Sequence, residues 1–188
     1  MGFLDTILGR TKVVRPNLDV LFAVPAASLT VQADLGLAPT GAGAVCFSSA
    51  EGQQSAEREA LALLTSTAVV TRDEYGYTWI TQRRTDGDLA ALVTDLHAVN
   101  TTLADAGYGA GLLCTVVGFA GTVDGQPRRV GLVYLFKRGT VYPFAPTADQ
   151  QRDTTLEMRV RAAITGELPV EGDLSRWFPV WDNPVTAG

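Results

Sequence analysis

The sequence predicts a single α+β domain, with a mainly antiparallel, twisted sheet built from hairpins and helices packed on one face. Residues 129–136 (RVGLVYLF) are β-branched, aromatic and apolar, which is typical of a central strand buried on both sides. Residues 112–121 are also strand-like and precede it across the polar turn VDGQP, so the two predict a hairpin. Residues 86–106 repeat apolar side chains at helical spacing.

Composition limits the kind of protein this is. The chain has 188 residues, 46% hydrophobic and 19% charged, which indicates one globular domain. Its net charge of -5 argues against nucleic-acid binding, which needs a basic face to neutralise phosphates. We expect a cytoplasmic protein, because no apolar stretch reaches the roughly 20 residues that span a bilayer and no secretory signal opens the chain.

The cysteines and the histidine do not indicate a metal or cofactor site. Cys46 and Cys114 both lie in apolar, strand-like runs, and the chain has one histidine. Such an isolated set lacks the spacing of a metal-binding motif. We expect free, buried thiols in a reducing compartment, although the sequence alone leaves a disulfide open.

Residues 1–15 predict a short amphipathic segment. Its apolar side fits two roles, contact with a membrane surface or partner, or docking on the protein's own core. We favour docking on the core, because the segment is short and Gly9 weakens a helix. The residues on the apolar side are Phe3, Leu4, Ile7 and Leu8.

The next stretch predicts a helix and a hairpin. A helix over 17–24 is expected to end at Pro25. Residues 28–35 alternate like a half-buried strand, residues 36–43 are rich in glycine and proline like a turn, and residues 44–48 form a short apolar strand. The two strands would pair with each other.

The middle of the chain predicts a helix, a hairpin and a long helix. The first helix covers 55–66, and residues 68–73 and 77–83 flank the tight turn DEYG. The long helix over 86–106 is expected to begin at the N-cap Asp86 and to be closed by Gly107.

The C-terminal third predicts one more helix and a tail. Two prolines are expected to keep residues 140–146 (TVYPFAP) out of the sheet interior, as an aromatic exit loop. A last helix covers about 149–165, which completes a core domain over 16–166. Residues 167–188 form an aromatic and proline-rich tail, which is typical of an arm packed on its own domain or of a docking motif.

Few residues suggest chemistry, so we do not expect an enzyme. His97 is the only histidine, and no serine lies in a G-x-S-x-G turn that could pair with it. Asn100 lies in the apolar stripe of the long helix, where a structural hydrogen bond is favoured over a ligand contact. Lys137 and Arg138 form a basic pair at a strand end, where a solvated rim is the usual role and contact with an acidic partner the alternative.

Several stretches together resemble one protein family over nearly the whole chain. They are MGFLDTILGR, RPNLDVLF, YGYTW, DLHAVN, VYLFKRGTVYPFAP and DLSRWFPVW. In this order they resemble the PspA-associated proteins of the PspAB type, found in actinobacteria and related microbes. The resemblance implies an accessory role in the phage-shock-protein-A envelope-stress system, with a PspA-like protein and an HtpX-type membrane metalloprotease as partners. It implies no enzymatic activity and no catalytic residue.

These observations lead to three functional hypotheses. The first is a non-catalytic adaptor that binds proteins and contacts the membrane at most peripherally. The second is a chaperone-like module that dimerises and holds a client segment, because the order of elements is similar to secretion-chaperone-like domains. The third is a small-molecule sensor or enzyme that uses His97 and Asn100. The aromatic residues expected to contact a partner are Tyr142, Phe144, Trp177, Phe178 and Trp181.

Overall fold

A six-stranded antiparallel sheet organises the fold. The computed structural model describes residues 16–48, 55, 58, 62 and 68–187. The strand order is β2-β3-β1-β4-β5-β6, so the first strand lies inside the sheet, between β3 and β4. The strands are β1 (Leu37–Ser48), β2 (Val69–Arg72), β3 (Tyr77–Arg83), β4 (Leu112–Val123), β5 (Gln126–Leu135) and β6 (Thr140–Phe144).

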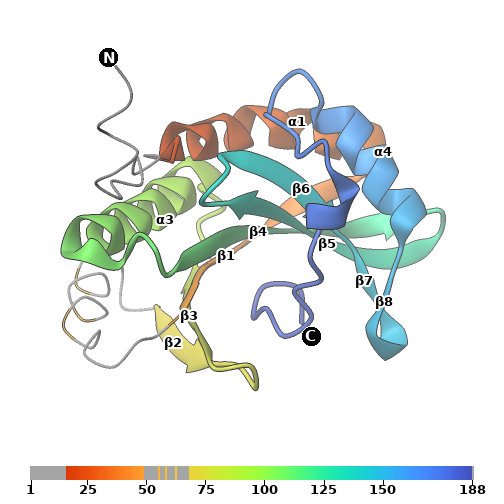
Figure 1. Cartoon of the computed structure of the whole chain (residues 1–188). Helices are drawn as coiled ribbons and strands as arrows, with labels where there is room; N and C mark the ends of the chain where they lie inside the picture. Colours follow the sequence, from red (N-terminus) through yellow and green to blue (C-terminus); the bar gives the residue numbers. More distant parts are fainter. Residues whose placement is uncertain (1–15, 49–54, 56–57, 59–61, 63–67, 188) are drawn as a thin grey trace, which may run out of the picture.

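Three α-helices cover one face of this sheet, which confirms the predicted α+β class (Figure 1). They are α1 (Val24–Leu35), which continues the 3-10 helix η1 (Leu18–Ala23), α3 (Leu89–Leu103) and α4 (Thr154–Ile164). Their apolar stripes and the facing strand residues form the larger hydrophobic core. Helix residues buried in it are Leu21, Val24, Ala27, Val31, Leu92, Val93, Leu96, Val99, Leu103, Leu156, Val160 and Ile164.

The predicted strand over 28–35, and with it the first hairpin, is wrong. These residues belong to α1, because Pro25 lies in the first turn of that helix, where its missing N–H is not needed. Gly36, with φ of 69°, ends α1 in the left-handed conformation. The predicted turn region is instead the first half of β1, which pairs with β3 and β4.

Residues 18–35 form a continuous helical segment. By length and composition alone, this segment is long and apolar enough to cross a membrane. Its inner side is buried against α3, α4 and the sheet. Of this segment, 33% is buried in the structure, and both a core helix and a signal sequence near an N-terminus pass the same test of length and composition.

The other two predicted hairpins are confirmed. Strand β2 pairs with β3 across the Asp73–Tyr77 turn, and β4 pairs with β5 across Asp124–Gly125. Strand β5 is buried on both faces from Val130 to Tyr134, as its apolar run predicts. The predicted helix over 55–66 lies largely outside the described residues.

Two helix starts differ from their predicted positions. Asp88 caps α3 and accepts the N–H of Ala91, while Asp86, the predicted cap, pairs with Arg84 at 2.8 Å. Asp153 caps α4 in the same way and accepts the N–H of Leu156.

Three stretches around these helices also differ from expectation. Residues expected in the first turn of α4 form a short hairpin instead, with strands β7 (Pro146–Thr147) and β8 (Gln151–Arg152). The predicted exit loop is mostly strand β6, which lies at the sheet edge, where Pro143 is tolerated. Gly107, expected to close α3, has φ of 90° in the π-helical turn Ala104–Tyr108 that follows the helix.

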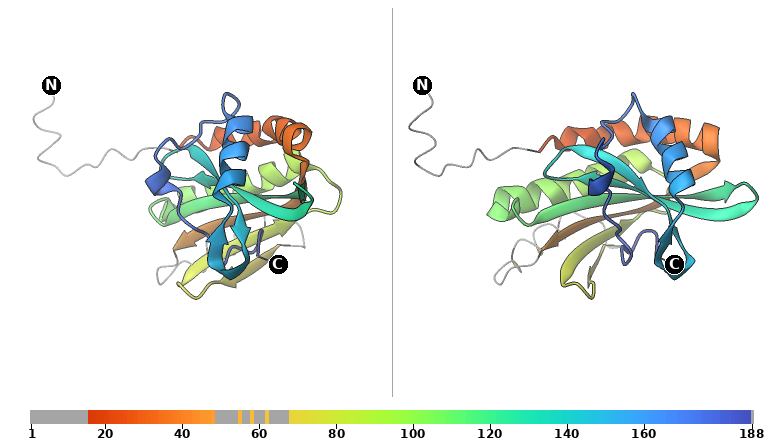
Figure 2. Two further views of the ribbon diagram at one scale, coloured as in Figure 1. Left: turned by 90° about the vertical axis from the view of Figure 1, so that its right-hand side faces the viewer. Right: turned by 45° about the vertical axis from the view of Figure 1, so that its right-hand side comes forward.

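The C-terminal tail crosses the sheet face opposite the helices (Figure 2). It includes a short 3-10 helix η4 (Leu174–Arg176), and its side chains join a second hydrophobic cluster with the sheet. The sheet is therefore covered on one side by helices and in part on the other by extended chain. The buried members of the second cluster are Ala42, Ala44, Cys46, Trp79, Cys114, Val116, Val133, Tyr142, Phe144, Trp177 and Val185.

Candidate functional site

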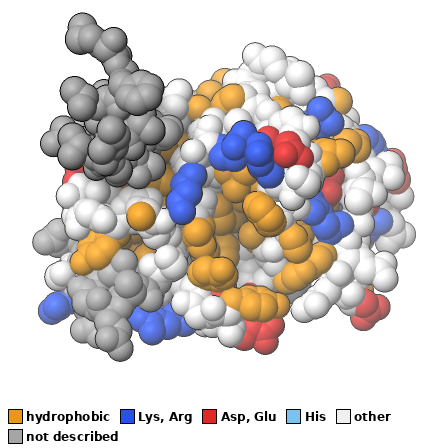
Figure 3. All heavy atoms as spheres, in the orientation of Figure 1, with side chains coloured by type: hydrophobic (Ala, Val, Ile, Leu, Met, Phe, Trp, Pro, Cys, Tyr) orange, Lys and Arg blue, Asp and Glu red, His pale blue; other side chains and the backbone are white. Residues whose placement is uncertain are grey.

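The candidate site is a groove of about 580 Å³ between the tail and this second sheet face. Its volume lies within the usual range for ligand pockets, about 300–1,000 Å³. We call it the aromatic groove, because aromatic side chains line it, among them Tyr75, Tyr77, Trp79, Phe178 and Trp181. Figure 3 shows hydrophobic side chains gathered around a hollow on this face, with basic side chains along its upper border.

The floor of the groove contains the two cysteines. Cys46 on β1 lies directly opposite Cys114 on β4, and both are free, buried thiols, as expected. The contact with Cys114 and then burial raise the pKa of Cys46. Because the thiolate is the nucleophile, the raised pKa makes the Cys46 thiol a poor nucleophile at neutral pH.

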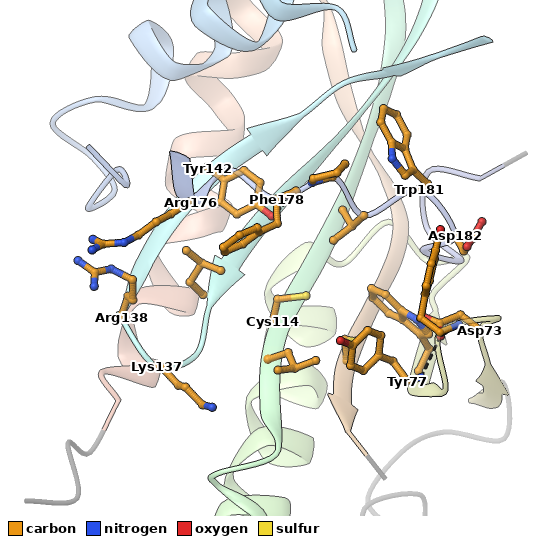
Figure 4. A pocket seen from close by; sticks show the side chains of 17 residues that line it. Asp73, Tyr77, Cys114, Lys137, Arg138, Tyr142, Arg176, Phe178, Trp181 and Asp182 are labelled. Atoms are coloured by element: carbon orange, nitrogen blue, oxygen red, sulfur yellow. Dashed lines mark hydrogen bonds between the residues drawn. The ribbon is translucent and has the colours of Figure 1, made fainter. Parts of the chain in front are cut away.

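Asp73 shapes one wall. One carboxylate oxygen accepts the backbone N–H groups of Tyr75 and Tyr77, at 3.0 and 2.9 Å. The other oxygen accepts the indole N–H of Trp79 at 2.9 Å (Figure 4). Gly76, with φ of 83°, supplies the left-handed residue of the turn. The Asp73 carboxylate thus fixes both the backbone of the turn and the indole ring of Trp79.

Glu171 anchors the start of the tail beside the groove. Its carboxylate is 4% exposed and accepts hydrogen bonds from Arg138 at 2.8 Å, Thr140 at 2.8 Å and the N–H of Asp173 at 3.0 Å. The Glu171 carbonyl accepts the indole N–H of Trp177 at 3.0 Å. Burial raises the pKa of Glu171, but the three hydrogen bonds outweigh it, so the pKa lies below its ordinary value of 4.5.

This lowered pKa predicts that Glu171 stabilises the fold above its unfolded-state pKa and that the contribution is lost as the pH falls through the folded-state value. We expect Glu171→Gln to lower the free energy of unfolding by about 1–2 kcal/mol at pH 7. The difference in the free energy of unfolding between Glu171→Gln and wild type should become smaller as the pH falls from about 5 to about 3. Urea unfolding at several pH values measures it, and equal stability of the two proteins at pH 7 would contradict the anchoring role.

Two further hydrogen bonds hold the tail above the sheet. The hydroxyl of Tyr142 donates to the carbonyl of Phe178 at 2.8 Å, and Arg152 donates to the carbonyl of Trp177 at 2.6 Å. The ring of Trp177 stacks on Tyr142 with 5.8 Å between centroids. The backbone on both sides of the Phe178 side chain is therefore fixed.

The five predicted partner contacts divide into supporting and exposed residues. Tyr142, Phe144 and Trp177 are almost fully buried, so they hold the tail on the sheet and present little surface to a partner. Trp181 is half-buried, with its ring edge-on to Phe144 at 5.1 Å, and lines the groove. Phe178 is 56% exposed and lines it as well, so these two remain the candidate contacts.

The polar candidates separate in the same way. Lys137 and Arg138 lie at one end of the groove (Figure 4). His97 and Asn100 lie on α3, on the other face of the sheet. Asn100 is buried and donates to Thr115 and the Leu96 carbonyl, both at 2.8 Å.

His97 makes local contacts on the helical side. Its ring lies 4.7 Å from that of Phe22, and its Nε2 lies 3.8 Å from a carboxylate oxygen of Asp19. Neither His97 nor Asn100 lines the groove. The four residues proposed for the N-terminal segment, Phe3, Leu4, Ile7 and Leu8, lie outside the described residues.

The sequence did not indicate Asp73, Tyr75 and Asp182 as parts of a site. The hairpin that carries Asp73 was predicted, but its approach to the tail depends on the strand order. Among the described residues, no group of three or more His, Cys, Asp or Glu side chains is placed to hold a metal ion. An apolar groove with aromatic walls and charged ends is suited to binding.

Comparison with known proteins agrees with the resemblance seen in the sequence. The model of the family PspAB, PspA associated protein B, matches residues 1–185. No curated protein and no solved structure matches the chain. Because the family match covers almost the entire chain, the protein belongs to the PspAB family.

Proposed function

We propose that this protein is a non-catalytic accessory protein that binds a PspA-like protein through the aromatic groove. The family description supports association with PspA. The observation that carries the choice of surface is Phe178, whose side chain is 56% exposed while its backbone carbonyl is held by Tyr142. An aromatic side chain on a fixed backbone loses little entropy when it is buried by a partner, which is typical of an interface anchor.

The wider role we propose is that of an adaptor in a bacterial envelope-stress response, on the cytoplasmic side of the membrane. The resemblance of the sequence to its family supports this role, with an HtpX-type metalloprotease as a second partner. Two features of the groove favour binding over catalysis: the raised pKa makes the Cys46 thiol a poor nucleophile, and the Asp73 carboxylate is engaged by three N–H groups.

The test compares Phe178→Ala with Leu174→Ala for binding to a purified PspA-like protein from the same organism. Leu174 is the matched control, because it is 53% exposed on the same tail but does not line the groove. We expect Phe178→Ala to weaken binding about 30-fold, corresponding to about 2 kcal/mol for an interface hot spot. Isothermal titration calorimetry measures the affinity, and thermal unfolding verifies that both variants are folded.

Two outcomes would contradict the proposal. One is wild-type affinity of Phe178→Ala, which would place the contact elsewhere. The other is an equal loss of affinity in Leu174→Ala, which would show that the groove is not the feature recognised.

The exposed groove also favours the second hypothesis, a chaperone-like module. That function requires binding to an unfolded client rather than to a folded partner. We expect the folded PspA-like protein to bind more tightly than a permanently unfolded, carboxymethylated protein of similar size. The reverse order, together with a dimer in sedimentation experiments, would favour the chaperone-like hypothesis.

The sensor or enzyme hypothesis gains no support from the geometry. It requires His97 and Asn100 to share one cavity. Asn100 is buried against Thr115, and His97 packs on Phe22.

A further inference from the structure

The two ends of the aromatic groove carry opposite charge. Lys137, Arg138 and Arg176 lie at one end, and Asp73 and Asp182 lie at the other (Figure 4). The floor between them is apolar. A bound segment would therefore meet cations at one end and carboxylates at the other.

The basic end has one cation without a carboxylate partner in the described structure. Arg138 pairs with Glu171 at 2.8 Å, and Arg176 lies 3.4 Å from Asp173 and 3.9 Å from Glu171. Lys137 is exposed and forms no ion pair with any described residue. Its ammonium group is the charge that remains for a ligand.

At the acidic end, the carboxylates of Asp73 and Asp182 have no cationic partner among the described residues. Asp73 accepts three neutral N–H donors and forms no ion pair within the described part of the chain. Asp182 is exposed and likewise forms no ion pair there. A hydrogen bond with Glu74, together with the negative charges of Glu74, Asp182 and Asp73, raises the pKa of Tyr75.

We infer that the groove takes a polypeptide segment in one orientation, with apolar side chains over the cysteine floor, an acidic side chain at Lys137 and a basic side chain at Asp73 and Asp182. This inference rests on the proposed function, which supplies the partner, and it adds the chemistry of the segment. Charge complementarity of this kind governs orientation and association rate, because the reversed segment would place like charges together at both ends.

Charge reversal at each end tests the orientation, with the same PspA-like protein as the probe. The variants are Lys137→Glu and Asp182→Lys. Matched controls are Arg161→Glu on α4 and Asp34→Lys on α1, which make the same charge changes on the opposite, helical face. All four positions are at least partly solvent-exposed, so the variants are expected to fold.

We expect Lys137→Glu and Asp182→Lys each to weaken binding about ten-fold at low salt, mainly through slower association. The loss should shrink to about two-fold when NaCl is raised from about 50 to about 500 mM, because salt screens exposed charges. The two controls should remain within about two-fold of wild type at both salt concentrations. Biolayer interferometry gives the association and dissociation rates separately.

The outcomes separate this inference from the proposed function. If Phe178→Ala loses binding while Lys137→Glu and Asp182→Lys behave like their controls, the groove is the binding site but the inferred orientation is overturned. If Phe178→Ala binds the PspA-like protein like wild type, or if the wild-type protein does not bind it, both the proposed function and this inference are contradicted. Tighter binding by either charge reversal also overturns the orientation.

Discussion

Trp177→Ala is expected to lower the free energy of unfolding by about 3–5 kcal/mol, the usual loss when a large buried aromatic side chain is removed. Trp177 is 5% exposed, stacks on Tyr142, and donates its indole N–H to the Glu171 carbonyl. The substitution removes the ring that joins the tail to the sheet. Urea unfolding followed by circular dichroism measures the change.

Leu174→Ala is the control for this prediction. Leu174 lies on the same tail but is mostly exposed, so its removal should change stability by no more than about 0.5 kcal/mol. A Trp177→Ala protein that is as stable as Leu174→Ala would contradict the assignment of the tail to the second core. It would then favour the sequence-based prediction that Trp177 is a partner contact.

Glu157→Ala is expected to destabilise the protein by a similar amount, about 3–5 kcal/mol, because it leaves a partly buried cation and a buried N–H without their acceptor. One oxygen of Glu157 accepts both the backbone N–H of Ala145 at 2.9 Å and the guanidinium of Arg152 at 2.8 Å. Arg152 in turn donates to the Trp177 carbonyl, so the substitution also loosens the tail.

Glu157→Gln is the informative partner variant. Its amide oxygen can still accept the N–H of Ala145, but it carries no charge for Arg152. We therefore expect a smaller loss, about 1–3 kcal/mol, in the same urea experiment. Equal stability of Glu157→Ala and wild type would contradict the role of this carboxylate as a link between α4 and the sheet.

Local patterns were enough to predict two of the three hairpins and the central strand. Strands β4 and β5 are rich in β-branched residues, and the turn DEYG joins β2 to β3. Both signals are local in sequence, so they predict these hairpins directly. Helix α1 was missed because a proline such as Pro25 can either end a helix or occupy its first turn. The neighbouring residues do not distinguish these two roles. The alternating pattern of residues 28–35 was then compatible with a strand.

The candidate site was predicted only in part, because its assembly is not local. Strand β1 lies between β3 and β4, and this insertion sets where the hairpin of Asp73 lies relative to the tail. Composition alone made Phe178 and Trp181 candidate contacts, and both line the groove. Trp177 and Phe178 are adjacent and equally aromatic, yet one is buried and the other exposed, and only the fold distinguishes them.

The most direct test of the central claim is hydrogen–deuterium exchange of this protein with and without a bound PspA-like protein. If the aromatic groove is the interface, binding will slow exchange in the Asp73–Trp79 hairpin, around Leu135–Arg138 and in the Arg176–Asp182 part of the tail. Helices α1 and α3, on the opposite face, will exchange as in the free protein. Protection confined to those helices, with the groove unchanged, would contradict the account.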